Sequence, residues 1–321
     1  MRRVGLAFAA LLIVIGVPLL MAPWFGWGAS TGQAVTVIVA RGASLRAVSR
    51  NLQAAGLVDA PQQFRILARV LGGDAPVQAG TYRLQSGDAW RTYLRAMQDG
   101  DVLRATLTIA EGLPSIIVAE RLRAEPRLTG KIGIPVEGSV LPETYEFTPG
   151  EARAVVLARM QAAMARTTAE LWASRSKRSM VKTPAEAIIL ASIVEKETGK
   201  SSERRRVAGV YSNRLAQGMK LDADPTVIYP LTKGKPLGRR IRRSELAADT
   251  GYNTYLKPGL PNGPIANPGR ASIAAVLDPE PTDAVFFVAD GSGGHVFAAT
   301  LAEHNANVAR WFALRRHRGE M

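Results

Sequence analysis

TPAEAIILASIVEKET, Thr183–Thr198, is the stretch of this sequence that says most about fold and function. Its apolar residues run almost without interruption, which predicts a helix that is buried on most of its sides. Thr183 and Glu186 fit a capping box and Pro184 fits the first helical position, so we expect the helix to begin here. Gly199 is expected to end it.

The predicted helix ends with two acidic side chains on opposite faces. At 100° per residue, Glu197 shares a stripe with Leu190 and Ile193, whereas Glu195 lies nearly opposite, beside Ser192. A carboxyl group in an apolar pocket keeps its proton, because burial raises its pKa, and a general acid at neutral pH requires that proton. From these residues alone two interpretations stay open: Glu197 is a catalytic acid, or it is the solvated end of a core helix.

The composition narrows the chemistry. The 321 residues have room for a membrane anchor and two modest domains. The chain contains no Cys and three His residues, which excludes disulfides and a thiolate nucleophile and makes a His-rich metal site unexpected. The formal net charge of +14 at pH 7 predicts anionic surroundings, which are nucleic acid, lipid headgroups or an acidic polymer.

The N-terminus selects among these surroundings. Residues 4–22 are apolar over a length close to a bilayer span, follow Arg2–Arg3 and precede the aromatic residue Trp24. We predict a single-pass anchor over residues 1–28, with the N-terminus in the cytoplasm and the bulk of the chain periplasmic, outside the inner membrane. The alternative is a signal peptide cleaved near residues 28–30. Either way, nucleic acid is not an expected partner, and the lipid bilayer or an acidic cell-wall polymer is.

Beyond the anchor, the hydrophobic pattern predicts an α+β chain. Strands that alternate apolar residues change to helical spacing after a glycine, which indicates three strand–turn–helix units. These units pair strand 35–39 with helix 45–55, strand 80–84 with helix 89–98, and strand 105–109 with helix 115–124; a further helix spans 61–71.

A Pro/Gly-rich connection separates these units from a second set of elements. The expected elements are helices 151–173, 203–217, 272–277 and 301–316, together with a hairpin of strands 284–289 and 295–298. Residues 220–267 contain many Pro, Gly, Asp and Asn residues and few periodic runs, which predicts a long loop. A loop of that length in a compact domain is more often functional than idle.

Short motifs follow one another over residues 184–305. They are ASIVEKET (191–198), YSNRL (211–215), DPTVIY (224–229), YNTY (252–255), GLP (259–261), PIANPG (264–269), FVADG (287–291), GGH (293–295) and EHN (303–305). In content and order they resemble the endolytic murein transglycosylase family, also called YceG-like. The N-terminal half is similar in outline, with an anchor over 1–28, a LysM-like glycan-binding module over 34–104 and the sequence PETY at 142–145 inside a connecting segment, 105–150. The catalytic domain would span 151–317.

The resemblance implies a lyase without metal or cofactor that cuts the β-1,4 bond between N-acetylmuramic acid and N-acetylglucosamine in peptidoglycan glycan strands. The C6 hydroxyl of the muramic acid displaces the bond and leaves a 1,6-anhydro end. Glu197 corresponds to the catalytic residue, which is also the residue that the helical-face argument selects. The family further implies that the enzyme limits nascent strand length, with peptidoglycan synthases as neighbours.

The motifs imply roles for other residues. The expected substrate-binding residues are Asp224, Thr226, Tyr252, Asn253, Tyr255 and Glu143. The expected supporting residues are Glu195, Asn213, His295, Glu303, His304 and Asn305. For two of these motifs a second interpretation stays open, since the Asp224 segment also fits a simple turn and the Tyr252 segment a packed loop.

Three departures from the family pattern, Asp222, Pro230 and Asn262, all lie in the predicted cleft loops and affect fine contacts rather than the reaction. A single glutamate can serve as acid and then as base, whereas a two-carboxylate glycosidase needs a second acid about 5–9.5 Å away, which Glu195 on the opposite face does not supply. Two other functions stay open: a non-catalytic peptidoglycan-binding protein, and a muramidase that uses water.

Overall fold

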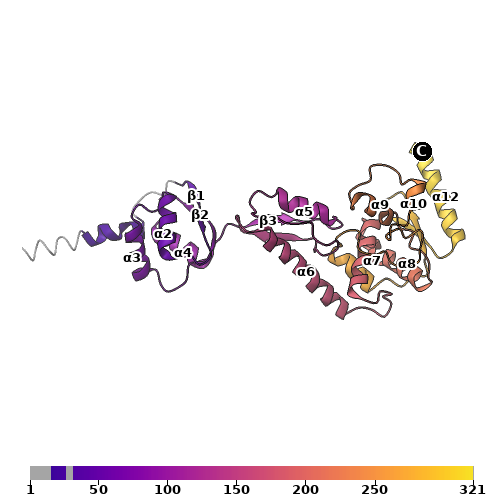
Figure 1. Ribbon diagram of the computed structural model, residues 1–321, viewed down its shortest axis with the longest axis horizontal. Helices are drawn as coiled ribbons and strands as arrows, with labels where there is room; N and C mark the ends of the chain where they lie inside the picture. The colour runs from indigo at the N-terminus through magenta and orange to yellow at the C-terminus, as the bar shows by residue number, and fades with distance from the viewer. Residues whose placement is uncertain (1–15, 27–31, 321) are drawn as a thin grey trace, which may run out of the picture. The chain divides into compact units, whose positions relative to one another are not determined.

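The computed structural model describes residues 16–26 and 32–320. The chain forms two compact units (Figure 1): residues 1–105 with 146–151, and residues 106–145 with 152–321. The predicted connecting segment, 105–150, is divided between the two units. Most of it belongs to the C-terminal unit, because the Ser115 amide and hydroxyl at the start of its helix both donate to Glu137, and Asn267 donates to the Ser115 hydroxyl.

The first unit has the predicted order of strands and helices. Its elements are a helix over 16–25, β1 (Ala34–Val39), α2 (Leu45–Ala54), α3 (Pro61–Leu71), β2 (Gly80–Gln85) and α4 (Trp90–Asp99). The two strands pair antiparallel, with Val37 opposite Tyr82, and the consecutive helices α2 and α3 connect them. Phe64 lies at the centre of the core, with its ring 5.9 Å from that of Trp90.

The N-terminal segment differs from the prediction in one respect. Trp24, expected at a membrane interface, is 3 % exposed and packs its ring 6.2 Å from Phe64, because the apolar core of the first unit offers it a partner. Residues 4–15 of the predicted span lie outside the described residues, as does the alternative cleavage site at residues 28–30. Within the described part of the chain, no helix combines the length and the apolar character that a membrane crossing requires.

The second unit is mainly helical. Two boundaries between the units fall within strands β3 (Ala105–Thr108) and β4 (Thr144–Phe147). The remaining elements of the second unit are α5 (Ser115–Ala124), α6 (Arg153–Ala173), α7 (Pro184–Glu197), the 3₁₀ turn η1 (Ser201–Glu203), α8 (Arg204–Ala216), α9 (Asp224–Thr232), α10 (Arg243–Leu246), α11 (Arg270–Leu277), β5 (Phe286–Ala289), β6 (His295–Ala298) and α12 (Leu301–His317). The mixed α+β class predicted from the sequence is confirmed in both units.

Helix α7 is the central helix of the second unit, and it packs against α6, α8, α9 and α11. Its residues Leu190, Ile193 and Val194 are completely buried, as the apolar run predicted. The Thr183 hydroxyl accepts a hydrogen bond from the Glu186 amide at 3.1 Å, which caps the first turn. The helix ends at Glu197, before the predicted stop at Gly199, because Thr198 has already turned to extended backbone.

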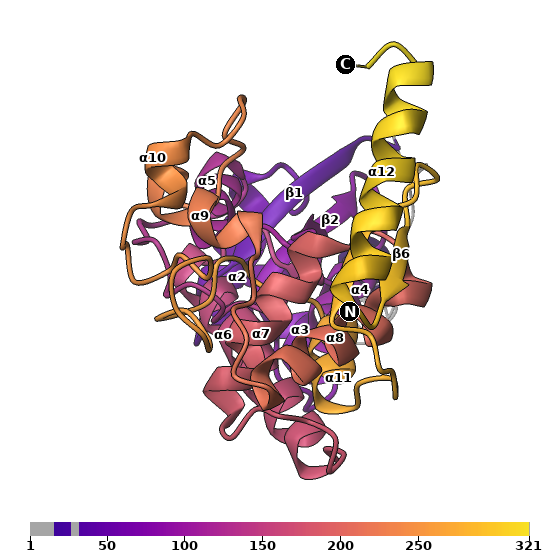
Figure 2. The ribbon, with the colours of Figure 1, turned by 90° about the vertical axis from the view of Figure 1, so that its right-hand side faces the viewer.

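Two further features shape the region around the end of α7. Strands β5 and β6 form the predicted antiparallel hairpin, with Phe287 opposite Phe297, and α12 packs against both strands (Figure 2). Residues 220–267 are not the continuous loop that we predicted, since they contain α9 and α10. Asp224 and Pro225 at the start of α9 are residues that favour a helix start, but Pro230 inside the segment argued against a helix.

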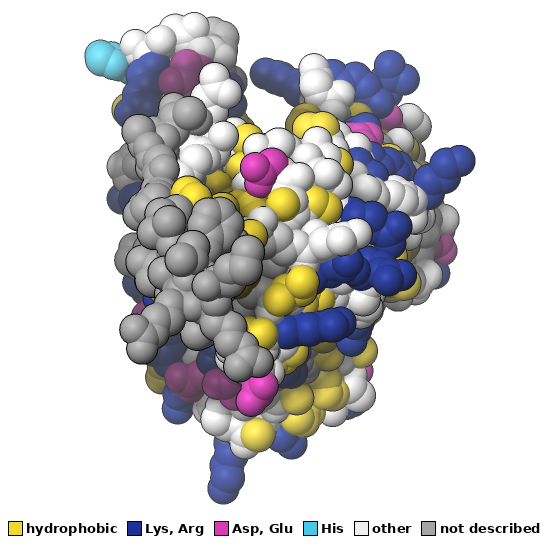
Figure 3. Space-filling model, turned by 90° about the vertical axis from the view of Figure 1, so that its left-hand side faces the viewer, with side chains coloured by type: hydrophobic (Ala, Val, Ile, Leu, Met, Phe, Trp, Pro, Cys, Tyr) yellow, Lys and Arg dark blue, Asp and Glu magenta, His cyan; other side chains and the backbone are white. Residues whose placement is uncertain are grey.

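The surface agrees with the strongly basic composition. On the face that Figure 3 shows, Lys and Arg side chains are spread among hydrophobic side chains, and acidic side chains are fewer. Such a surface suits contact with anionic material.

Candidate active site

Glu197 borders a groove of about 870 Å³ in the second unit. The walls of the groove come from the ends of α7 and α9, one face of α8, the loop that carries Tyr255, strand β5 and one face of α12. Elements that are far apart in the sequence thus meet around the last residue of the buried helix.

The environment of Glu197 keeps its carboxyl group protonated into the neutral range. Burial is the main cause that raises its pKa to about 7, and the negative charge of Asp224 adds to it. A hydrogen bond with Tyr211 and the positive charge of Arg214 act in the opposite direction. Glu197 Oε1 is shielded from solvent and has no hydrogen-bond partner in the protein. An acid with these properties is suited to give its proton to a bound substrate.

The surroundings of Glu195 differ from those of Glu197, as the helical-face argument predicted. One of its carboxylate oxygens accepts a hydrogen bond from the Gly269 amide at 2.9 Å, and the other lies 3.6 Å from the Arg204 guanidinium. Its side chain is 6 % exposed and does not border the groove. Glu195 therefore holds the loop before α11 against α7, which is a supporting role.

Asp224 and Tyr255 are predicted substrate residues that the structure does bring to the groove. The Tyr255 hydroxyl donates to Asp224 Oδ1 at 2.7 Å, and both residues border the groove together with Glu197. Burial and this hydrogen bond to a carboxylate raise the pKa of Tyr255, so its hydroxyl stays protonated. The groove thus holds one protonated carboxyl group and, close to it, one charged carboxylate.

Arg214 supports the floor of the groove. Its guanidinium donates to the carbonyl oxygens of Val285 at 2.6 Å, Lys220 at 3.0 Å and Leu221 at 3.2 Å, and it pairs with Asp222 at 2.9 Å. Its side chain is 10 % exposed. These contacts tie α8 to the residue before β5 and to the segment that leads into α9, so they fix the position of the segment that carries Asp224.

Two predicted substrate residues lie in the protein interior instead. Thr226 is completely buried, and its hydroxyl donates to the Ala223 carbonyl at 2.6 Å. The Asn253 amide donates to the carbonyl oxygens of Leu246 and Ala248, and its oxygen accepts from the Tyr255 amide at 3.0 Å. These polar groups are buried and satisfy backbone groups of the loops, so they are not presented to a sugar in the groove. They position Asp224 and Tyr255 rather than contact substrate.

Tyr252 and Glu143 also lie away from the groove. The Tyr252 ring packs 5.0 Å from that of Tyr229 on α9, which is the packed-loop alternative left open by the sequence. Glu143 is exposed, and its carbonyl accepts from the Ile109 amide at 3.0 Å. Neither side chain borders the space next to Glu197.

The expected supporting residues divide into two groups. Asn213 donates to the carbonyl oxygens of Thr282 and Ala284, His295 Nδ1 lies 2.9 Å from Glu203, and Glu303 caps α12. All three side chains make their contacts within the protein, and their supporting role stays a prediction. His304 and Asn305 differ, because both border the groove.

His304 packs flat on Phe286, with ring centroids 5.0 Å apart, and its Nδ1 is shielded and has no hydrogen-bond partner in the protein. Burial, followed by the charge of Arg214, lowers the pKa of His304 and keeps it neutral. It therefore adds no positive charge next to Glu197.

Sequence reasoning missed the partners of Glu197 on α8. Tyr211 and Arg214 are three residues apart, so they share a helix face, and both belong to the motif YSNRL that was already noted. That spacing was the available signal. The aromatic residues of β5 and α12 that border the groove, including Phe286 and Trp311, carried no comparable signal, because aromatic residues at such spacing are usually core.

A protonated glutamate with a shielded carboxyl oxygen, at the wall of a groove in an α+β protein, is the arrangement of an enzyme that uses a general acid. The YceG-like family description matches residues 37–310, which is most of the chain. The chain therefore belongs to the YceG-like family, and the resemblance seen in its motifs is confirmed.

Proteins with known names agree with this placement. A Bacillus subtilis (strain 168) protein is 27 % identical over 303 residues, which cover 84 % of this chain and 83 % of the relative. A Streptococcus pneumoniae (strain D39) protein is 28 % identical over 330 residues, covering 88 % of this chain and 59 % of the relative. Both are named endolytic murein transglycosylase.

A solved structure is also similar. The crystal structure of a putative YceG-like protein from Listeria monocytogenes superposes with a TM-score of 0.53 at 27 % sequence identity. The match covers 86 % of this chain and 99 % of that one. The similarity thus extends over both units and not only over the segment with the motifs.

Proposed function

We propose that this protein is an endolytic murein transglycosylase, which cuts peptidoglycan glycan strands between N-acetylmuramic acid and N-acetylglucosamine. The observation that carries the proposal is the buried Glu197 carboxyl group, with its pKa raised to about 7, at the wall of a groove. Family membership and the names of the relatives support the same activity.

The proposed reaction uses the Glu197 carboxyl group twice, first as an acid and then as a base. Glu197 donates its proton to the glycosidic oxygen, and the bond from this oxygen to C1 of the muramic acid breaks. The C6 hydroxyl oxygen of the same sugar forms a new bond to C1, and the resulting Glu197 carboxylate takes the hydroxyl proton. The products are a 1,6-anhydro end and a free C4 hydroxyl, with no water consumed. An internal nucleophile has an effective concentration that water cannot match.

Asp224 has a defined part in this scheme. Positive charge develops at C1 as the glycosidic bond breaks, and a nearby carboxylate stabilises such charge. The same negative charge favours the protonated form of Glu197 before the reaction. The Tyr255 hydroxyl, at 2.7 Å from Asp224, fixes the orientation of the carboxylate.

The proposal includes the location of the enzyme in the cell and the role of its N-terminal unit. The apolar residues 4–22 after Arg2–Arg3 support a single inner-membrane anchor that leaves both units in the periplasm. The order of β1, α2, α3 and β2 supports a LysM-like glycan-binding module over 34–104. An anchored endolytic enzyme of this kind would limit the length of nascent strands beside peptidoglycan synthases.

Asp224 also favours a second candidate, a muramidase that uses water, since a second carboxylate in the groove could activate a water molecule. A digest of purified glycan strands, analysed by mass spectrometry, distinguishes the candidates. We expect 1,6-anhydro-muramic ends. Reducing muramic ends would show the muramidase instead, and intact strands that nevertheless bind the protein would show a glycan-binding protein without catalytic activity.

A further inference from the structure

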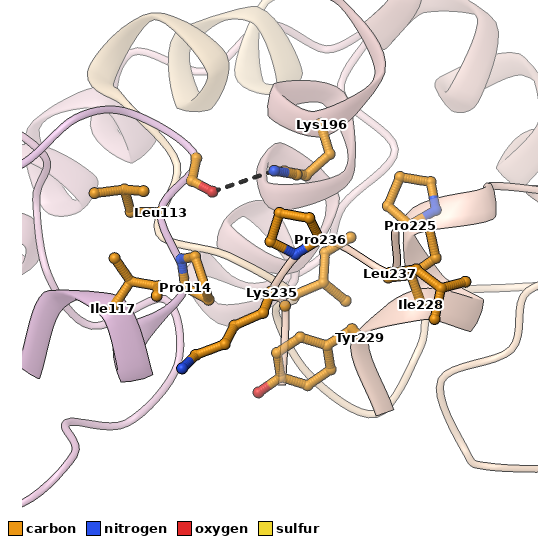
Figure 4. A pocket seen from close by; sticks show the side chains of 13 residues that line it. Leu113, Pro114, Ile117, Lys196, Pro225, Ile228, Tyr229, Lys235, Pro236 and Leu237 are labelled. Carbon is orange, nitrogen blue, oxygen red and sulfur yellow. Dashed lines mark hydrogen bonds between the residues drawn. The ribbon is translucent and has the colours of Figure 1, made fainter. Parts of the chain in front are cut away.

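A second pocket in the C-terminal unit has no part in the reaction described above. It has a volume of about 510 Å³ and is mainly apolar. Figure 4 shows Leu113 and Ile117 on one side of it and Pro225 and Ile228 on the other, with Leu237 also in the wall. A concave apolar surface of this size, with few polar groups, is typical of a site for an aliphatic ligand.

This pocket and the catalytic groove share two elements. Lys196 borders the pocket, and the next residue of α7, Glu197, borders the groove. In the same way, Pro225 borders the pocket, and the residue before it, Asp224, borders the groove. The C-terminal end of α7 therefore separates a ligand in the pocket from the reacting bond in the groove.

The charge of Lys196 is available to a ligand. Lys235, the other lysine at the pocket, pairs with Glu120 at 2.7 Å. Lys196 is exposed, and its ammonium donates one long hydrogen bond, of 3.5 Å, to the Gly112 carbonyl (Figure 4). Among the residues that the structure describes, no carboxylate pairs with it. An unpaired ammonium at the edge of an apolar pocket selects a ligand that combines aliphatic groups with a negative charge.

We propose that this pocket binds the stem peptide that N-acetylmuramic acid carries in murein, with Lys196 pairing with a peptide carboxylate. The proposal rests on the proposed function. The peptide joins the lactyl group of the sugar whose C1 reacts, and it combines methyl and methylene groups with free carboxylates. Four extended residues span roughly 13 Å, which is comparable to the diameter of about 10–12 Å of an α-helix with its side chains.

The test compares glycan strands that carry stem peptides with strands from which an amidase has removed them. Lys196→Gln removes the charge, and Leu237→Glu places a carboxylate in the pocket wall at a half-buried loop position. For peptide-bearing strands we expect KM to rise about five-fold in Lys196→Gln and about ten-fold or more in Leu237→Glu. For peptide-free strands we expect KM within two-fold of the unsubstituted protein. Lys177→Gln, at an exposed lysine in the loop before α7, is the matched control and is expected to change neither.

A binding measurement separates this proposal from the proposed function. In calorimetric titrations of the full chain, N-acetylmuramyl tetrapeptide should bind more tightly than N-acetylmuramic acid, and Lys196→Gln should remove the difference while Lys196→Arg keeps it. This result would support the pocket even if no strand were cut. Equal affinity for the two probes, or equal KM changes on both kinds of strand, would overturn the pocket whether or not cleavage is observed.

Discussion

Glu197→Gln is expected to lower the release of anhydro products by about 10³-fold or more, because the amide cannot donate a proton to the glycosidic oxygen or accept one from the C6 hydroxyl. The side chain is nearly unchanged in size, so the groove should keep its shape and its affinity for glycan. The measurement is the initial rate of product release from purified strands at saturating substrate. Turnover within ten-fold of the unsubstituted protein would exclude Glu197 as the proton donor.

Stability provides the control for this variant. The pKa of Glu197 is raised to about 7 in the folded protein and is near 4.5 in the unfolded chain. The unfolded chain therefore loses its proton first, and the free energy of unfolding falls as pH rises from 4.5 to 7, by about 3 kcal/mol in total. Glu197→Gln lacks this penalty, so it should match the unsubstituted protein at pH 4 and be more stable at pH 8. A variant that is less stable at pH 8 would indicate a damaged fold.

Glu195→Gln separates the two acids of the EKET segment. Its amide oxygen can still accept from Gly269, but the charge beside Arg204 is lost. We expect a modest loss of stability and turnover within a few-fold of the unsubstituted protein. A loss of turnover as large as that of Glu197→Gln would mean that the opposite faces of α7 do not separate the two roles.

Arg214→Met is expected to destabilise the C-terminal unit by about 3–5 kcal/mol. Three carbonyl oxygens that accept from the guanidinium, those of Lys220, Leu221 and Val285, would lose their donor in a place with little access to water. Methionine keeps much of the volume of the side chain, so the effect reports the lost hydrogen bonds. Urea unfolding at constant pH measures it.

The control for Arg214 is an arginine with good geometry on the surface. Arg270 makes two hydrogen bonds to Glu170, at 2.9 Å and 3.1 Å, but its side chain is 49 % exposed. Solvent screens such a pair, so Arg270→Met should cost less than about 1 kcal/mol. If the two substitutions lower the free energy of unfolding by the same amount, the buried guanidinium does not organise the floor of the groove.

The sequence predicted those parts of the molecule in which local pattern and burial agree. The apolar run before Glu197 specifies a core helix whatever surrounds it, and the alternating segments 284–289 and 295–298 specify a hairpin. The different surroundings of Glu195 and Glu197 follow from the geometry of one helix. These conclusions need no knowledge of distant segments.

The predictions that failed depend on contacts between distant segments. Thr226 and Asn253 have polar side chains that suit sugars, but the loops of the folded chain use those polar groups to satisfy buried backbone. Trp24 follows an apolar segment, yet the core of the first unit offers it Phe64. Sequence gives the chemistry of a side chain, whereas tertiary contacts decide whether that chemistry remains free for a ligand.

The most direct test of the account is the titration of the Glu197 carboxyl group itself. Carbon-13 labelling of the glutamate side-chain carboxyl carbons, with the Glu197 signal assigned by its absence from Glu197→Gln, would follow this group by NMR as pH is raised. We expect a midpoint near pH 7, since burial and Asp224 both favour the protonated form. A midpoint near 4.5 would show a hydrated, ionised carboxylate and would contradict its role as the proton donor.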